Sequence, residues 1–240
     1  SSRPFGNLHM SLFSPPTIDF NAPLAHRMRP RTLDEYVGQE HFIGEGKLLR
    51  RLLKADRLMS IIFYGPPGTG KTALARLIAK ESKAFFEELN AAGSKVAEVK
   101  EALSDAETRR TISERTVLFI DEIHRFNRAQ QDVLLPGVEK GLITLVGATT
   151  HNPFFSINSA LVSRSQIFQF EPLSSENLIV LLRRALKDTD RGFGDMRIEA
   201  DDDALLHLAD ISDGDARRAL NGLEIAVLSS EPKSGQTLHL

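Results

Sequence analysis

The segment Ile61 to Thr72, which reads IIFYGPPGTGKT, holds the residue types in this chain with the clearest chemical purpose. A short apolar run leads into a glycine-rich turn that ends in a lysine and a threonine, the G-x-x-x-x-G-K-[ST] pattern of a phosphate-binding loop. Glycines let backbone N–H groups approach a triphosphate closely, and a helix starting at the lysine would direct its free amides at the same phosphates. We therefore expect a nucleotide site formed by Gly65, Pro66, Pro67, Gly68, Thr69, Gly70, Lys71, Thr72 and Ala73, with the Thr72 hydroxyl on Mg²⁺.

The same letters can also describe a plain glycine and proline turn between a strand and a helix. Context separates the two interpretations. Ile61 to Tyr64 has the pattern of a buried strand, and the segment after the turn, TALARLIAKES, has Leu74, Leu77 and Ile78 at helical spacing. A strand, loop and helix in this order favour the phosphate site.

A second group of reactive side chains follows in VLFIDE, Val117 to Glu122. Four apolar residues that run into two acids are typical of a buried parallel strand ending at the carboxyl edge of a sheet, where open α/β folds bind ligands. We expect Asp121 to hold the Mg²⁺ that Thr72 also contacts, and Glu122 to orient and polarise the attacking water. The alternative is a strand end capped by solvated acids.

Hydrolysis of a triphosphate needs further groups around the γ-phosphate, because phosphoryl transfer depends on positioning and charge stabilisation. The segment LVGATTHN ends another apolar run with Thr149 and Thr150. A hydroxyl here could bind the lytic water or the γ-phosphate. A threonine pair in a strand-ending turn remains the alternative, more so for Thr149 than for Thr150.

The elements that must position these groups alternate between strands and helices, as in a parallel sheet with crossover helices. Apolar runs predict five strands at Ile61–Tyr64, Phe85–Leu89, Val117–Asp121, Ile143–Ala148 and Ile167–Phe170. Helices are predicted at Ser94–Ile112 and Ala129–Val138, the second ended early by Pro136 and Gly137. From Pro172 onward only helical patterns remain, at Ser174–Lys187, Ala200–Ala209 and Asp213–Leu228, with N-caps at Ser174, Asp201 and Asp213. The predicted fold is an α/β five-stranded parallel sheet with flanking helices, followed by a small all-helical lid.

Length and composition agree with this organisation. The chain has 240 residues, 41% hydrophobic and 26% charged, which suits a globular protein of one or two domains. We expect residues 1–9 to be an expression scar, 10–171 the nucleotide-binding domain, 172–230 the helical lid, and 231–240 a linker to a missing region. The absence of cysteine excludes disulfides and thiolate zinc sites, and a formal net charge of -2 excludes a global field that attracts nucleic acid. With no membrane-spanning run, a cytoplasmic protein is expected.

Five segments in this order resemble the AAA+ ATPases: GPPGTGKT, VLFIDEIHRFN, GATTHNP, the Ser163–Arg164 pair and GDARRALN. Within them the chain resembles the clamp-loader clade, and more narrowly the replication-associated recombination protein A family, also called MgsA and similar to the Werner-helicase-interacting ATPase. The upstream segment Leu24 to Gly44 strengthens the likeness, which covers nearly everything from Leu24 to Leu228.

The resemblance implies roles that the patterns alone do not give. It implies that Tyr36, Val37 and Gly38 contact adenine, that Thr150 is the sensor 1 residue, and that Arg217 is the sensor 2 arginine reaching the γ-phosphate from the lid. It also implies that Arg164 is an arginine finger acting on the nucleotide of a neighbouring subunit. Without it, Arg164 reads equally as a helix-terminal arginine favoured by the helix dipole, and Arg217 and Arg218 as a solvated helix face.

By this likeness we expect an ATP- and Mg²⁺-dependent ATPase of DNA replication, recombination and repair. It would act as an oligomer, near the nucleoid, on stalled forks, gaps or single-strand/double-strand junctions, with single-strand-binding or other replisome proteins as further partners. Two other functions stay open: a clamp-loader subunit or Holliday-junction branch-migration motor, and an adaptor that binds ATP without needing hydrolysis. The intact acid pair disfavours the adaptor.

Weaker signals come from scattered basic and histidine residues. The seven histidines include no pair at metal-binding spacing. Arg125, Arg128, Lys95 and Lys100 could line a DNA path, although ordinary solvated charges are the more common explanation of such residues. No aromatic platform for stacking a single strand is evident from the sequence, which lacks tryptophan.

Overall fold

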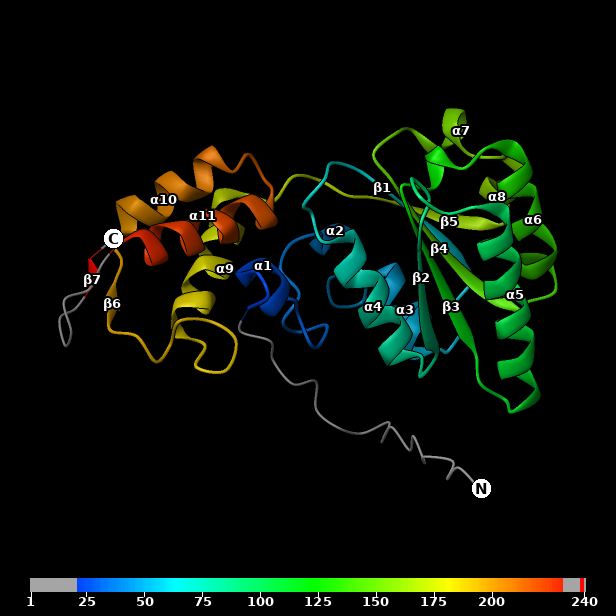
Figure 1. Cartoon of the computed structure of the whole chain (residues 1–240), viewed down its shortest axis with the longest axis horizontal. Helices are drawn as coiled ribbons and strands as arrows, with labels where there is room; N and C mark the ends of the chain where they lie inside the picture. The colour runs from blue at the N-terminus through cyan, green and yellow to red at the C-terminus, as the bar shows by residue number, and fades with distance from the viewer. Residues whose placement is uncertain (1–20, 231–237, 240) are drawn as a thin grey trace, which may run out of the picture.

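Five parallel strands form the sheet on which the candidate site is built, and they lie in the order β2-β3-β4-β1-β5. The computed structural model describes residues 21–230 and 238–239 (Figure 1). The strands are β1 Ser60–Tyr64, β2 Phe85–Asn90, β3 Thr116–Asp121, β4 Ile143–Thr149 and β5 Ser165–Gln169. The predicted five-stranded parallel sheet is confirmed, although β5 begins and ends earlier than its apolar run suggests.

Helices cover both faces of this sheet, because alternate residues of each strand point to opposite sides. Ile61 and Phe63 of β1 pack with α2 Glu40–Ile43, α3 Leu48–Lys54 and α4 Lys71–Glu81 on one face. Ile62 packs on the other face with α5 Val96–Thr111, α6 Arg128–Glu139 and α8 Ser159–Val162. All three of these β1 side chains are fully buried. Burial on both faces explains why the strands read as unbroken apolar runs rather than as alternating patterns.

Helix α6 extends beyond the point where the sequence predicts its end. It continues through Pro136 and Gly137 to Glu139. Pro136 lies on the exposed side of the helix, where water can satisfy the carbonyl that loses its amide partner. Gly137 is buried, and a Cβ there would lie 2.7 Å from the Leu103 side chain, so glycine permits close packing against α5. The predicted early end of this helix is therefore wrong.

Three longer helices, α9 Ser175–Lys187, α10 Asp202–Ile211 and α11 Ala216–Ser229, form the lid with the short helix α1 Leu24–Arg27. Leu24 and Met28 are buried in the lid core, which the sequence patterns do not indicate. The lid also contains a two-residue strand pair, β6 Ile198–Glu199 with β7 Leu238–His239, so it is not entirely helical. The predicted expression scar lies outside the described residues, as does most of the predicted linker.

The helix caps of the lid are partly as predicted. Ser174 caps α9 by accepting a hydrogen bond from the Asn177 backbone N–H at 3.2 Å. Asp201 stands at the N-cap of α10 without a side-chain capping bond. The predicted Asp213 cap is wrong, because Asp215 caps α11 through the Arg218 N–H at 3.0 Å, while Asp213 lies in the preceding turn with a φ of 50°. This shift places Asp215 at the edge of the candidate site.

Candidate nucleotide site

The phosphate loop leaves the carboxyl end of β1 and ends at Gly70, the N-cap of α4. Gly70 has a φ of 94°, and a Cβ on it would lie 2.6 Å from the Tyr36 hydroxyl oxygen. Gly68 has a φ of 69°, and a Cβ there would lie 1.9 Å from the Asp215 carboxyl carbon. Both positions require glycine for conformation and for space. The loop is thus packed between the Tyr36 side chain and Asp215 of the lid.

Lys71 is buried at the start of α4 and has its ammonium turned into the loop. Its Nζ donates hydrogen bonds to the carbonyl oxygens of Gly65 at 2.9 Å and Pro66 at 2.5 Å. Burial lowers the pKa of Lys71 to about 8, and Asp121 and Asp215 oppose that shift without cancelling it. The first turn of α4 contains no acidic side chain, so the positive end of the helix adds to the lysine. An anion with several negative oxygens suits this place.

We expect ATP binding near pH 8 to be accompanied by proton uptake at Lys71. At a pKa of about 8 a large part of Lys71 is neutral in the nucleotide-free protein at that pH, whereas a bound triphosphate favours the ammonium and raises its pKa. ATP affinity should therefore fall as pH rises above 8. Calorimetric titrations at pH 8 in two buffers of different protonation enthalpy measure the uptake.

Lys71→Arg is the matched control, because a guanidinium stays protonated throughout this range. The variant should show less proton uptake than the parent protein at pH 8. Equal uptake in the two proteins would contradict a titrating Lys71.

The acid pair stands at the end of β3, at the same edge of the sheet as the phosphate loop. Asp121 pairs with Asn90 of β2, and burial raises its pKa while the bond from the Glu122 N–H and the charge of Lys71 act in the opposite direction. Glu122 adopts a φ of 52° and starts the single turn η1 Ile123–Arg125. Its Oε2 lies 2.8 Å from Arg125 Nε. The glutamate is therefore held to one side by an arginine of its own turn.

The Thr72 hydroxyl and the Asp121 carboxylate fit a Mg²⁺ ion in chemical type, since both offer the oxygen ligands this metal prefers. Among the described residues, no group of three or more histidine or acidic side chains is arranged so that it could hold a metal ion. A site with two protein oxygens matches the usual way Mg²⁺ binds with a nucleotide, where phosphates and water complete its shell.

The two threonines at the end of β4, Thr149 within the strand and Thr150 after it, differ in their surroundings. Thr149 is buried, and its Oγ1 lies 2.9 Å from His124 Nδ1 and accepts the His151 N–H at 2.9 Å. The His124 and His151 rings stack with centroids 4.1 Å apart. Thr150 is exposed. Because Thr149 pairs with Tyr64 in register, Thr150 lies level with the start of the phosphate loop. Thr149 thus supports the turn, and Thr150 is the residue free to meet a ligand.

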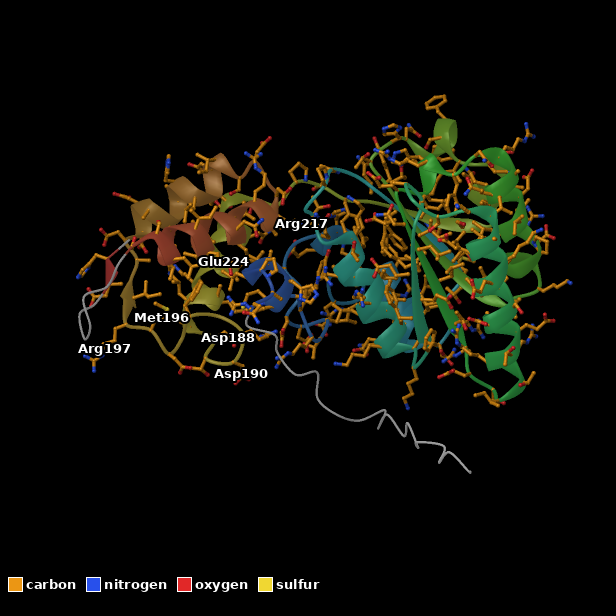
Figure 2. The ribbon with its side chains drawn as sticks, viewed as in Figure 1. Asp188, Asp190, Met196, Arg197, Arg217 and Glu224 are labelled. Atoms are coloured by element: carbon orange, nitrogen blue, oxygen red, sulfur yellow. The ribbon has the colours of Figure 1, made fainter. Side chains whose placement is uncertain are left out.

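The lid reaches the phosphate loop at the start of α11. The Ala216 N–H donates to the Gly68 carbonyl oxygen at 3.0 Å. Arg217 is exposed at this end of the helix, on the side of the lid that faces the sheet domain (Figure 2). Its charge contributes to the lowered pKa of both Lys71 and Arg29. Arg217 therefore lies within electrostatic range of Lys71.

Arg29 and Asp215 lie near the predicted site residues, and reasoning from the sequence does not single them out. The pKa of Arg29 is lowered by burial first and then by Arg76, with a further contribution from Arg217. Arg29 thus adds to the positive field at this edge. In the sequence, Arg29 is part of RPRTLDEYVGQ and Asp215 is part of GDARRALN. Neither segment has a pattern that by itself indicates a binding or catalytic role.

The segment predicted to contact adenine joins the phosphate loop to the lid. The Tyr36 hydroxyl donates to the Thr69 carbonyl oxygen at 3.2 Å, and burial raises the pKa of Tyr36. Gly38 has a φ of 83°, and a Cβ there would lie 2.4 Å from Leu173 at the start of the lid. The Tyr36 hydroxyl therefore supports the loop, and contact of Tyr36, Val37 and Gly38 with adenine stays a prediction.

Arg164 lies at the opposite edge of the sheet from these residues. It immediately precedes Ser165, which pairs with Ser60 at the start of β1, whereas the phosphate loop follows the end of β1. The strand between them spans roughly 13 Å. Arg164 therefore cannot complete the site of its own subunit, which agrees with the predicted action on a neighbour.

Comparison with known proteins defines the class. Residues 61–173 match the ATPase family associated with various cellular activities (AAA), and residues 194–239 match an AAA C-terminal domain. A solved structure of Thermotoga maritima RuvB, described as a Holliday junction branch migration motor, aligns with a TM-score of 0.68. That structure is 30% identical, and the match covers 85% of this chain and 66% of the RuvB chain. An A156S mutant of RuvB is 30% identical with 68% of its chain covered. The chain belongs to the AAA ATPase family.

Within this family the curated relatives narrow the likeness. Replication-associated recombination protein A of Escherichia coli K12 is 47% identical over 213 residues, which are 87% of this chain and 48% of that protein. The Bacillus subtilis protein of the same name is 42% identical over 91% of this chain, and ATPase WRNIP1 of Dictyostelium discoideum is 45% identical over 88%. This chain thus spans about half the length of the bacterial relatives it matches. In the described part of the chain, no helix is long and apolar enough to cross a membrane.

Proposed function

We propose that this chain is the Mg²⁺-dependent ATP-hydrolysing core of a protein that maintains DNA during replication and recombination. The observation that supports the proposal is that Lys71, the acid pair and the start of α11 in the lid all lie at the carboxyl edge of the sheet. Lys71 and the amides of the loop would hold the phosphates, while Thr72 and Asp121 would hold the metal, which shields phosphate charge. Glu122 would orient and polarise the attacking water after leaving Arg125.

Two cations would complete the site when ATP is bound. Arg217 would reach the γ-phosphate from the lid of the same subunit, and Arg164 of a neighbouring subunit would stabilise charge in the transition state. Thr150, exposed at the end of β4, would contact the lytic water or the γ-phosphate. An oligomer is therefore part of the proposal, because the edge carrying Arg164 faces away from the subunit's own nucleotide.

The task in DNA metabolism is supported by the names of the relatives and by the surface near the acid pair. Lys95 is the N-cap of α5 and Arg128 is the first residue of α6. The Gln130 side chain joins the two helix starts by donating to the Ser94 carbonyl oxygen at 2.8 Å. Neither cation has an ion pair among the described residues. Phe155, on the short helix α7 Pro153–Ser156, is 90% exposed. Cations and an exposed ring at this edge suit contact with a nucleic acid strand. We propose that the protein works in the cytoplasm, at the nucleoid.

A branch-migration motor is the second candidate, favoured by the likeness to RuvB. The two functions differ in the DNA that stimulates hydrolysis. ATPase rates of the full-length protein should be measured with blunt duplex, gapped, forked, single-stranded and four-way-junction DNA. We expect forks, gaps and single-stranded ends to give the largest stimulation. Stimulation by four-way junctions alone would favour the motor, and no stimulation by any DNA would contradict both.

A further inference from the structure

Arg164 is held in place by a second residue at the edge of the sheet that faces away from the subunit's own nucleotide. Its Nη2 lies 2.8 Å from Glu139 Oε1 at the end of α6. Its Nη1 donates to the Ala160 carbonyl oxygen at 3.0 Å and to Ser163 Oγ at 3.3 Å. The side chain is nevertheless 42% exposed, so its guanidinium keeps a face that an external phosphate can reach.

Glu139 occupies a position where an acid has a cost unless a cation accompanies it. It is the last residue of α6, where the helix dipole disfavours negative charge, and the last turn contains no basic residue of its own. Because α6 continues through Pro136 and Gly137, its last turn includes Glu139 and brings the Glu139 carboxylate to Arg164. An exposed ion pair contributes little to stability, so its main effect is on the direction of the arginine.

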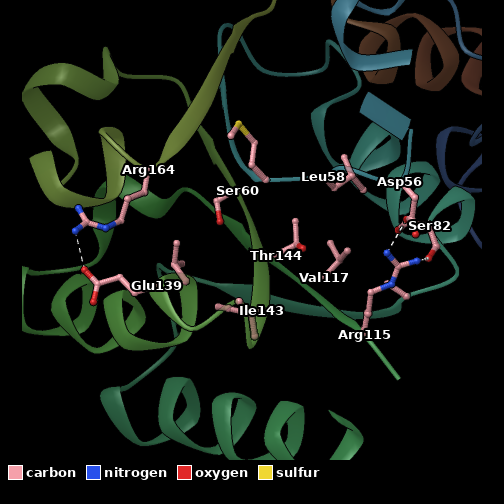
Figure 3. Close-up of a pocket in the computed structure, with 14 residues that line it drawn as sticks. Asp56, Leu58, Ser60, Ser82, Arg115, Val117, Glu139, Ile143, Thr144 and Arg164 are labelled. Carbon is pink, nitrogen blue, oxygen red and sulfur yellow. Dashed lines mark hydrogen bonds and ion pairs between the residues drawn. The ribbon is translucent and has the colours of Figure 1, made fainter. Parts of the chain in front are cut away.

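The pair stands at one wall of a cavity of about 500 Å³ at the amino edge of the sheet (Figure 3). At the other wall Arg115 pairs with Asp56 at 2.6 Å and with the Ser82 carbonyl oxygen at 2.5 Å. The two arginines are therefore fixed separately. The second pair offers a control of equal chemistry on the same face of the molecule.

We propose that Glu139 is a positioning residue for Arg164, which sets the guanidinium in the direction from which it contacts the nucleotide of a neighbouring subunit. This inference rests on the proposed action of Arg164 in trans. Without the carboxylate, the guanidinium keeps only the bonds from Nη1 to Ala160 and Ser163, and Nη2 loses its partner. Small misplacements of a catalytic group lower rates strongly. Glu139 does not contact the nucleotide of its own subunit, so it affects turnover and leaves nucleotide binding unchanged.

The first test is steady-state ATP hydrolysis by the full-length oligomer. Glu139→Ala should lower kcat by about 10- to 100-fold with little change in KM. Glu139→Gln keeps an oxygen acceptor and should recover part of the loss. Asp56→Ala, which breaks the matched pair at the other wall, should leave kcat near the parent value. A Glu139→Ala protein with unchanged or raised kcat would overturn the proposal.

The second test mixes subunits to show where Glu139 acts. Lys71→Ala subunits cannot hold a triphosphate but still offer an intact Arg164 with its Glu139. In a mixture with Glu139→Ala subunits, the Lys71→Ala subunits supply a correctly held Arg164 to the intact nucleotide sites of their Glu139→Ala neighbours. The hydrolysis rate per Glu139→Ala subunit should therefore be higher in the mixture than in the oligomer made of Glu139→Ala subunits alone. A mixture of Arg164→Ala subunits with Lys71→Ala subunits serves as the reference.

The outcomes separate the inference from the function on which it rests. A rise in both mixtures supports the positioning role. A rise with Arg164→Ala and none with Glu139→Ala overturns the role of Glu139 and leaves the trans-acting arginine intact. No rise in either mixture removes the trans-acting arginine, and the proposed positioning role falls with it.

Discussion

Glu122→Gln should abolish ATP turnover while ATP still binds. The glutamine has nearly the same shape, and the backbone N–H of residue 122 still donates to Asp121 Oδ1 at 3.0 Å, so the turn η1 and the metal ligand stay in place. What it loses is the negative charge that polarises water. General base groups contribute typically 10²- to 10⁴-fold to a rate, and a loss in this range is expected for kcat. Hydrolysis assays together with binding of a fluorescent ATP analogue measure the two effects.

The charge-matched control is Glu107→Gln, which removes one exposed carboxylate towards the C-terminal end of α5, the end farther from Lys95 and the acid pair. It should leave both binding and turnover unchanged. Turnover in Glu122→Gln equal to that of the parent protein would remove this glutamate from the proposed mechanism. Loss of ATP binding in the variant would instead assign it a structural role in the site.

The sheet could be predicted from sequence because its strands are buried on both faces. Ile61, Ile62 and Phe63 are all fully buried, so consecutive apolar letters mark the strand directly. The phosphate loop and the acid pair follow two such strands at their carboxyl ends. Parallel pairing then places them at one edge without further information.

Features that depend on contacts between distant segments could not be predicted in the same way. Helix α1 packs with the lid because the Leu24 N–H bonds the Glu224 carboxylate, at 3.0 and 2.9 Å to its two oxygens, across 200 positions in sequence. The continuation of α6 through Pro136 depends on exposure of that proline and on the space that Gly137 leaves for Leu103. Local rules for proline and glycine take no account of such neighbours.

The same limit applies to the polar groups of the site. The two successive threonines at the end of β4 have the same local pattern, and only the hydrogen bonds of Thr149 with the stacked histidines distinguish its role from that of Thr150. Arg29 enters the site from an irregular segment with no periodic pattern, because its neighbours Arg76 and Arg217 come from α4 and α11. The grouping of these arginines therefore depends on the tertiary fold, and a local sequence pattern does not indicate it.

Arg164→Ala should lower kcat by about 10³- to 10⁵-fold, the range that trans-acting arginines contribute in related phosphoryl transfer. Nucleotide affinity should change little, because Arg164 lies at the amino edge of the sheet, and the nucleotide site of its own chain lies at the carboxyl edge. Arg164→Lys should recover only part of the rate, since an ammonium keeps the charge but lacks the planar fork of donors.

Arg115→Ala provides the matched control, because Arg115 also pairs with a carboxylate at the same edge and lines the same cavity. It should keep kcat near the parent value. If Arg164 were merely a helix-terminal arginine, its removal would lower the melting temperature and leave kcat alone, which is the opposite pattern. Rates measured over a range of protein concentration add a further criterion: turnover by the parent protein should rise with assembly, whereas turnover by Arg164→Ala should not, because its subunits bring no cation to one another.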